Sequence, residues 1–189
     1  LITAVQYQHT DTSTPTDGDR LIDVIVNDGT DDSVAARTTI NVNPVNTAPT
    51  VDLDANDSSG ATGNDYQVTF TEGGAPIAIA DTDTDLVDGD STTFDHVKLS
   101  ITGLLDGNTE TLMLDGDTFA LATAVAGQDT TGGNYHVVIG TGAGTATITI
   151  TKQGGGLFTE GETETLITAV QYQHTDTSTP PDGARLIDE

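Results

Sequence analysis

Hydrophobic and polar residues alternate with a period of two along several short stretches of this chain. Two clear examples are residues 20–27 (RLIDVIVN) and 145–152 (TATITITK). Such alternation is typical of a β-strand that buries one face. Each stretch is bounded by Gly, Asp or Asn, which favour turns. The pattern predicts strands at residues 20–27, 36–43, 66–71, 77–80, 95–102, 110–114, 118–122, 135–139, 145–152 and 171–174.

Helical patterning is expected in one place, within residues 159–168. Thr159 can accept a hydrogen bond from the first turn, and Glu162 stands three residues later, which is the spacing of a capping box. Gly161 counts against the helix because glycine has a low helix propensity. Many short strands joined by polar turns favour two packed sheets. We therefore predict an all-β fold, a Greek-key β-sandwich with at most one short helix.

The two ends of the chain carry nearly the same sequence. Residues 1–24 and 166–189 are offset by 165 positions and differ only at Thr16/Pro181, Asp19/Ala184 and Val24/Glu189. Such close identity predicts a tandem array with a period of about 165 residues. A cloning artefact or a permuted sequence is the alternative interpretation.

A domain boundary is expected near Pro44 and Pro49, because proline cannot donate a hydrogen bond to a sheet. Residues 1–46 would then be the C-terminal strands of one repeat. Residues 47–189 would be most of the next repeat, without its final hairpin. Residues 20–43 could complete that second sandwich within the chain or between identical chains, in a head-to-tail filament. Alternatively, the half-domains belong to covalent neighbours in a longer chain.

The charge of the chain excludes several classes of function. Thirty Asp and Glu oppose five Lys and Arg, for a net charge of −25 among 189 residues. Nucleic acid and anionic membranes both require clustered positive charge, so neither is an expected partner. No apolar run approaches the roughly 20 residues that cross a membrane. The absence of cysteine excludes disulfides, and the isolated histidines form no known catalytic motif, so we do not expect an enzyme.

Several phrases occur in a fixed order along the chain. They are residues 20–29 (RLIDVIVNDG), 45–49 (VNTAP), 72–74 (EGG), 81–83 (DTD) and 172–188 (YQHTDTSTPPDGARLID). Together they resemble bacterial cadherin-like, or Ig-like, tandem repeats of giant RTX-type surface adhesins. Thr47 departs from that family, which usually has Asp in the linker, and residues 115–144 match least well.

The resemblance implies a function at the bacterial cell surface. It suggests an extracellular, secreted stalk repeat that calcium rigidifies and that supports cell adhesion or biofilm formation, with no catalysis. Its partners would be neighbouring repeats. The alternative is a calcium-dependent module that binds a glycan or another partner. A row of threonines within residues 145–151 could also order water, although an exposed strand face explains it more simply.

The strongest calcium candidate is the acidic segment 81–90, which holds five Asp in ten residues. Calcium takes six to eight oxygen ligands, largely from carboxylates and carbonyls. Two carboxylates about 4 Å apart repel by roughly 1 kcal/mol even in water, and a cation removes this cost. Leu86 and Thr92 stand where an EF-hand needs Gly and Glu, so the segment is not an EF-hand. A solvated acidic loop is the alternative. The candidate ligands are Asp81, Asp83, Asp85, Asp88 and Asp90.

Two further acidic groups could hold calcium. Asp52 and Asp54 follow the proline-rich boundary, and the resemblance adds Glu72 to them. Asp28 and Asp31 lie in the turn after residues 20–27, where an ordinary polar turn is the alternative. Sequence spacing leaves open which groups share an ion.

Overall fold

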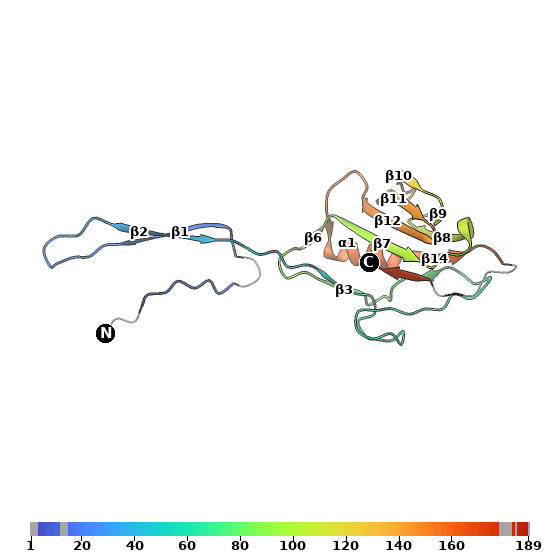
Figure 1. The fold of residues 1–189 in the computed structure, drawn as a ribbon, viewed down its shortest axis with the longest axis horizontal. Helices are drawn as coiled ribbons and strands as arrows, with labels where there is room; N and C mark the ends of the chain where they lie inside the picture. Colours follow the sequence, from blue (N-terminus) through green and yellow to red (C-terminus); the bar gives the residue numbers. More distant parts are fainter. Residues whose placement is uncertain (1–3, 12–14, 178–182, 184, 189) are drawn as a thin grey trace. The chain divides into compact units, whose positions relative to one another are not determined.

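The computed structural model describes residues 4–11, 15–177, 183 and 185–188 (Figure 1). The chain divides into two compact units. Unit 1 comprises residues 1–49 and 88–90, and unit 2 comprises residues 50–87 and 91–189. Among the described residues, no helix has the length and apolar character needed to cross a membrane.

Unit 1 contains an antiparallel hairpin of β1 (Gly18–Val24) and β2 (Ala36–Val42). Its register opposes Asp23 to Arg37, and the Arg37 Nε and Nη2 atoms donate to the Asp23 carboxylate at 2.7 and 2.8 Å. This confirms the hairpin that alternation predicted.

Unit 2 is built from antiparallel sheets. The larger sheet has the strand order β10 (Val125–Asp129), β11 (Tyr135–Gly142), β12 (Thr145–Lys152), β7 (His96–Thr102), β15 (Leu186–Asp188). The second sheet has the order β4 (Ile77–Ala78), β14 (Gln171–His174), β8 (Glu110–Leu114), β9 (Asp117–Ala120). Two short pairs complete the strands: β13 (Phe158–Thr159) with β6 (Thr93–Phe94), and β3 (Thr50–Asp52) with β5 (Asp85–Val87).

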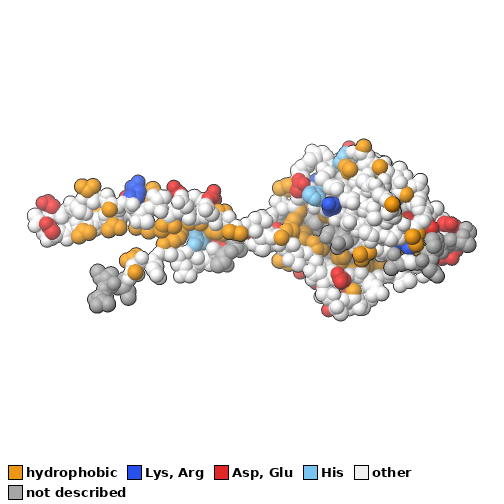
Figure 2. All heavy atoms as spheres, viewed as in Figure 1, with side chains coloured by type: hydrophobic (Ala, Val, Ile, Leu, Met, Phe, Trp, Pro, Cys, Tyr) orange, Lys and Arg blue, Asp and Glu red, His pale blue; other side chains and the backbone are white. Residues whose placement is uncertain are grey.

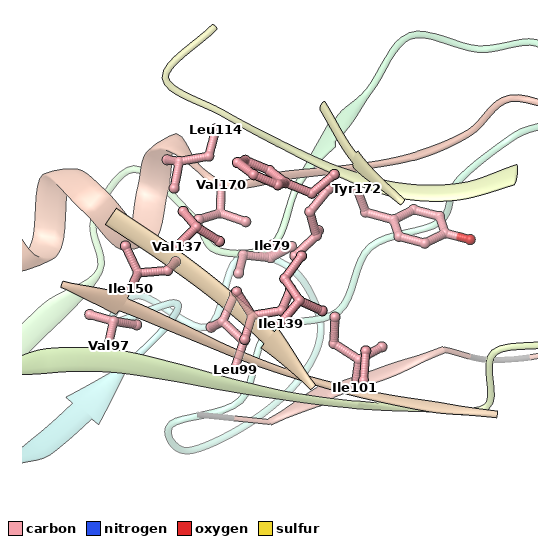
Figure 3. Packing of buried hydrophobic residues seen from close by; sticks show 14 of the residues in the cluster. Ile79, Val97, Leu99, Ile101, Leu114, Val137, Ile139, Ile150, Val170 and Tyr172 are labelled. Atoms are coloured by element: carbon pink, nitrogen blue, oxygen red, sulfur yellow. The ribbon is translucent and has the colours of Figure 1, made fainter. Parts of the chain in front are cut away.

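One α-helix, α1 (Glu160–Ala169), and one 3-10 turn, η1 (Gly107–Thr109), occur among the described residues. The all-β class with one short helix is therefore confirmed, while the Greek-key connectivity stays a prediction. The two larger sheets and α1 bury their apolar side chains in one core (Figure 3). In β7 the buried residues alternate as Val97, Leu99 and Ile101, which is the period expected for a strand with one face in the core.

A capping box starts α1, as the sequence predicted. The Glu162 backbone N–H donates to Thr159 Oγ1 at 3.3 Å, and the Thr159 N–H donates to the Glu162 carboxylate at 2.8 Å. Two N–H groups that the helix itself cannot satisfy thereby gain acceptors.

Replacing Thr159 by alanine should lower the free energy of unfolding by about 1 kcal/mol, because the cap hydroxyl is lost. Urea denaturation followed by circular dichroism measures this change. Thr165→Ala is the matched control: Thr165 is exposed in the same helix, and alanine favours a helix more than threonine does. Equal losses in the two variants would contradict the capping role.

The strand predicted at residues 66–71 is wrong, since the segment has no strand partner. Side chains hold it instead: the Phe70 ring meets the Tyr172 ring edge-on at 5.7 Å, and the Gln67 N–H donates to Ser59 Oγ at 3.1 Å. The sequence analysis also missed β3, β5, β6, β10, β13 and β15. Five of these six have two or three residues, too few for alternation to show.

The repeated phrase adopts two structures. In unit 2 it supplies the end of α1 and then β14, and Val170 is 1% exposed. In unit 1 the same letters at residues 4–9 form no regular secondary structure, and Val5 is 93% exposed. Packing against a core, rather than local propensity, therefore decides the conformation of this phrase.

Candidate metal centre

Three carboxylates meet in unit 2, those of Asp54, Asp81 and Asp83. One oxygen from each lies within 4.8 Å of the others. Asp54 is fully buried, and the other two are half-buried. Within the described part of the chain, this is the one group of three or more acidic or histidine side chains close enough to share a metal ion.

The pairing of β3 with β5 explains why these residues meet. The antiparallel register opposes Asp52 to Asp85, so residues just after β3 lie beside residues just before β5. Backbone contacts continue this approach: the Asp81 N–H donates to the Leu53 carbonyl oxygen at 2.8 Å. The site therefore takes one ligand from the acidic group after the prolines and two from segment 81–90.

Short loops on both sides hold the site in place. The Ser58 and Ser59 N–H groups donate to the Asp54 carboxylate at 3.0 and 2.7 Å. Ser58 Oγ lies 3.2 Å from Asp54 Oδ1 and 2.9 Å from Asp81 Oδ2, so it links two of the carboxylates. Hydrogen bonds from Ser59 lower the pKa of Asp54, and the Ser58 hydroxyl lowers the pKa of Asp81. Both groups are therefore ionised at neutral pH.

Asp83 carries an oxygen without a donor. Its Oδ1 is buried and has no hydrogen-bond partner. Leaving a buried acceptor unsatisfied costs about 1–3 kcal/mol, and more when the group is charged. Beside two further carboxylates, a cation would satisfy this oxygen. The acidic triad could thus hold a metal ion.

The other predicted ligands lie outside this group. Asp52 stabilises the backbone next to the triad, because its Oδ1 accepts the Asp54 N–H at 3.1 Å. Asp85 is exposed on β5, and Glu72 is exposed on a loop. Four remain, all in unit 1: Asp28, Asp31, Asp88 and Asp90.

These four residues have backbone partners of their own within unit 1, although Asp90 Oδ1 is buried without a hydrogen-bond partner. Asp28 Oδ1 accepts the N–H groups of Thr30 and Asp31, as in an ordinary polar turn. Asp88 Oδ1 accepts the Asp90 N–H at 3.0 Å, and Asp90 Oδ2 accepts the Thr47 N–H.

A second polar cluster escaped the sequence analysis. The Glu110 carboxylate is fully buried and accepts four hydrogen bonds. The Leu105 and Asp106 N–H groups donate to Oε1 at 2.7 and 3.0 Å, while Tyr172 Oη and Arg185 Nε donate to Oε2 at 2.9 and 2.6 Å. One signal could have pointed to this cluster. Arginine is rare in the chain, yet both copies of the repeated phrase retain it, as Arg20 and Arg185.

Burial by itself would raise the pKa of Glu110, but the Arg185 guanidinium and the backbone donors outweigh it and hold that pKa below 4.5. Burial and the neighbouring Glu110 raise the pKa of Tyr172, so its hydroxyl stays protonated. His174 Nε2 lies 2.8 Å from Asp106 Oδ2, which extends the cluster toward the surface. Every strong acceptor of Glu110 is occupied, so the cluster is suited to fixing the C-terminal segment.

In comparisons with known proteins, no family model, no curated protein and no solved structure matches this chain.

Proposed function

We propose that this chain is a calcium-rigidified extracellular stalk repeat of a bacterial surface adhesin or filament, without catalytic activity. The observation that carries the proposal is the buried, donor-free Oδ1 of Asp83 beside the carboxylates of Asp54 and Asp81. The extracellular setting and the adhesive role come from the resemblance of the sequence phrases to cadherin-like repeats.

Calcium suits this site better than magnesium. Calcium accepts six to eight oxygens at flexible positions, whereas magnesium requires near-ideal octahedral geometry and gives up its water reluctantly. Three carboxylates supply charge and part of the ligand set, and water or backbone carbonyls would supply the rest. The acceptors are all oxygens, as a hard cation prefers.

The ion would act by joining two segments. Asp54 lies after β3, and Asp81 and Asp83 lie before β5. Of the chain between them, residues 55–76 contain no strand, and the two-residue β4 follows before Asp81. An ion that binds both ends ties down this long connection and removes the mutual repulsion of three carboxylates. The unit would become stiffer under calcium, which is the property that a stalk requires.

Calcium should raise the free energy of unfolding of the wild-type chain. A ligand that binds only the folded state adds about 2.7 kcal/mol at a concentration one hundred times its Kd. Thermal melts in EDTA, in millimolar calcium and in millimolar magnesium measure the effect. Amide hydrogen exchange across residues 53–84 should slow in calcium.

Asp83→Asn is the decisive variant because it keeps the shape of the side chain and removes its charge. We expect it to lose the calcium response while staying as stable as the wild type in EDTA, since the lost carboxylate oxygen had no donor. Asp31→Asn, in the unit 1 turn, is the matched control and should keep the response. An unchanged wild-type midpoint in calcium would overturn the calcium proposal.

A further inference from the structure

The phrase Arg-Leu-Ile-Asp occurs twice, and the structure gives its two copies different partners. In unit 2, β15 is the outermost strand of the five-stranded sheet and pairs with β7. In unit 1, the same letters belong to β1, which among the described strands pairs only with β2. Ile187 of the unit 2 copy packs against the hydrophobic core. The unit 1 copy has the same chemistry without that core.

The hairpin exposes an apolar row. Ile22, Val24 and Val26 are 40%, 51% and 66% exposed. Residues two apart in a strand share one face, so Ile22 and Val24 lie on the same face of β1, and Val26 follows two residues after the strand ends. Figure 2 shows hydrophobic side chains in orange along this hairpin. A two-stranded hairpin alone is at best marginally stable, so such a surface requires a cover.

The register of β15 against β7 indicates which β7 residues the apolar row of the hairpin would face. There, Leu186 opposes Thr102 and Ile187 opposes Ile101. The same register places Ile22 opposite Ile101, Val24 opposite Leu99 and Val26 opposite Val97. Those three β7 residues are the buried ones, and opposite residues of an antiparallel pair point to the same face. The exposed apolar row of the hairpin would therefore cover the core-facing row of β7.

Arginine supplies charge complementarity at the same place. Arg185 Nε donates to the buried Glu110 at 2.6 Å. Arg20 holds the equivalent position in β1, where Nη1 and Nη2 donate to the carbonyl oxygens of Gly18 and Thr16 at 3.0 and 2.8 Å. Both acceptors are local and easily replaced by water, whereas Glu110 is a buried carboxylate that requires a cation.

We propose that the β1–β2 hairpin of one chain docks on the β7 edge of unit 2 in a second copy of this chain, displacing β15. Residues 20–26 would take the place of residues 185–188, with Arg20 on Glu110 and β2 as the new outermost strand. Because donor and acceptor surfaces differ, the contact repeats head to tail and lengthens the assembly. The proposal does not depend on the metal site.

Cysteine trapping tests the register directly, because the chain contains no cysteine. Leu21→Cys in one chain and Thr102→Cys in another are mixed in equal amounts and oxidised at physiological salt. Directly opposed strand positions lie within disulfide range. We expect a disulfide between positions 21 and 102, identified by peptide mass mapping of the dimer band on a non-reducing gel.

Leu186→Cys with Thr102→Cys in one chain is the matched control. It tests the same acceptor position and should close within the monomer, since these residues oppose each other in unit 2. If the control closes while the mixed chains give no disulfide between positions 21 and 102, the proposal is overturned. A chain that carries both Leu21→Cys and Thr102→Cys gives a further test. If its disulfide forms only within one chain and not between chains, the proposal is overturned as well.

Arginine variants separate this exchange from chance collisions. Arg20→Ala in the donor should lower the yield of the cross-link roughly tenfold, because a hydrogen bond to a charged group is lost. Arg185→Ala in the acceptor should raise it by a similar factor, since β15 then loses its anchor while Glu110 stays available. A cross-link yield that neither substitution changes would contradict the proposed docking mode.

Discussion

Replacing Glu110 by alanine should lower the free energy of unfolding by about 3–5 kcal/mol. Removing one partner of a buried ion pair leaves the other buried without compensation, and costs of this size are typical. Here the remaining partner is Arg185, whose side chain is 11% exposed and keeps only the longer Nη2 contact with Asp106 Oδ2, at 3.4 Å, as an ion pair among the described residues. Tyr172 also loses its acceptor. The substitution also removes the anchor of β15. Urea denaturation in EDTA measures the loss.

Glu72→Ala is the control for this experiment, because Glu72 is an exposed carboxylate on a loop. It should change the unfolding free energy by at most about 0.5 kcal/mol. A similar small loss for Glu110→Ala would contradict the structural role of the buried cluster.

The pH dependence of stability gives a second test of the role of Glu110. Its pKa in the folded chain lies below the ordinary 4.5, so the ionised form stabilises the fold. That contribution is complete above about pH 4.5 and is lost as the pH falls through the lower folded value. Asp54, Asp81 and Asp115 have lowered pKa values as well, so the wild type must be compared with Glu110→Gln. The stability difference between these two chains should shrink in acid. A constant difference from pH 7 to pH 3 would contradict this assignment.

Leu166→Ala should cost about 2–5 kcal/mol, the range for removing a buried leucine side chain. Leu166 is fully buried in α1, where it joins the core between the two larger sheets. Alanine favours a helix at least as well as leucine, so the loss would measure packing and not helix propensity.

Leu157→Ala is the matched control, since Leu157 is 50% exposed shortly before the same helix. Its cost should be a small fraction of the cost at Leu166. Chemical denaturation of both variants under one set of conditions gives the comparison. Similar costs at the two positions would show that Leu166 does not carry the packing of α1.

Local chemistry in the sequence was enough to predict much of unit 2 and the hairpin. Period-two alternation marked β7, β12 and the β1–β2 hairpin, because a strand with one face in a core must alternate. Thr159 and Glu162 marked the start of α1, because a capping box needs only four consecutive residues. In these elements the signal and its cause lie within the same few residues.

The metal centre and the buried cluster depended on contacts between distant segments. The sequence marked Asp54 and Asp81 as acidic candidates, but only the β3–β5 register brought them together and left Asp28 in a separate turn. The sequence did not indicate Glu110 as a buried group, because a single Glu between Thr109 and Thr111 forms no recognisable motif. Its partner Arg185 lies 75 positions later.

The repeated phrase shows most directly what the sequence determines and what the tertiary structure decides. Nearly identical letters form the end of α1 and β14 in unit 2, but no regular structure at residues 4–9. Its apolar spacing follows from the amino acids alone, and so does its capacity to pack. Whether it becomes a helix and a strand depends on the core it meets, because burying Val170 and Tyr172 provides the free energy that orders the backbone. Only the tertiary structure supplies that core.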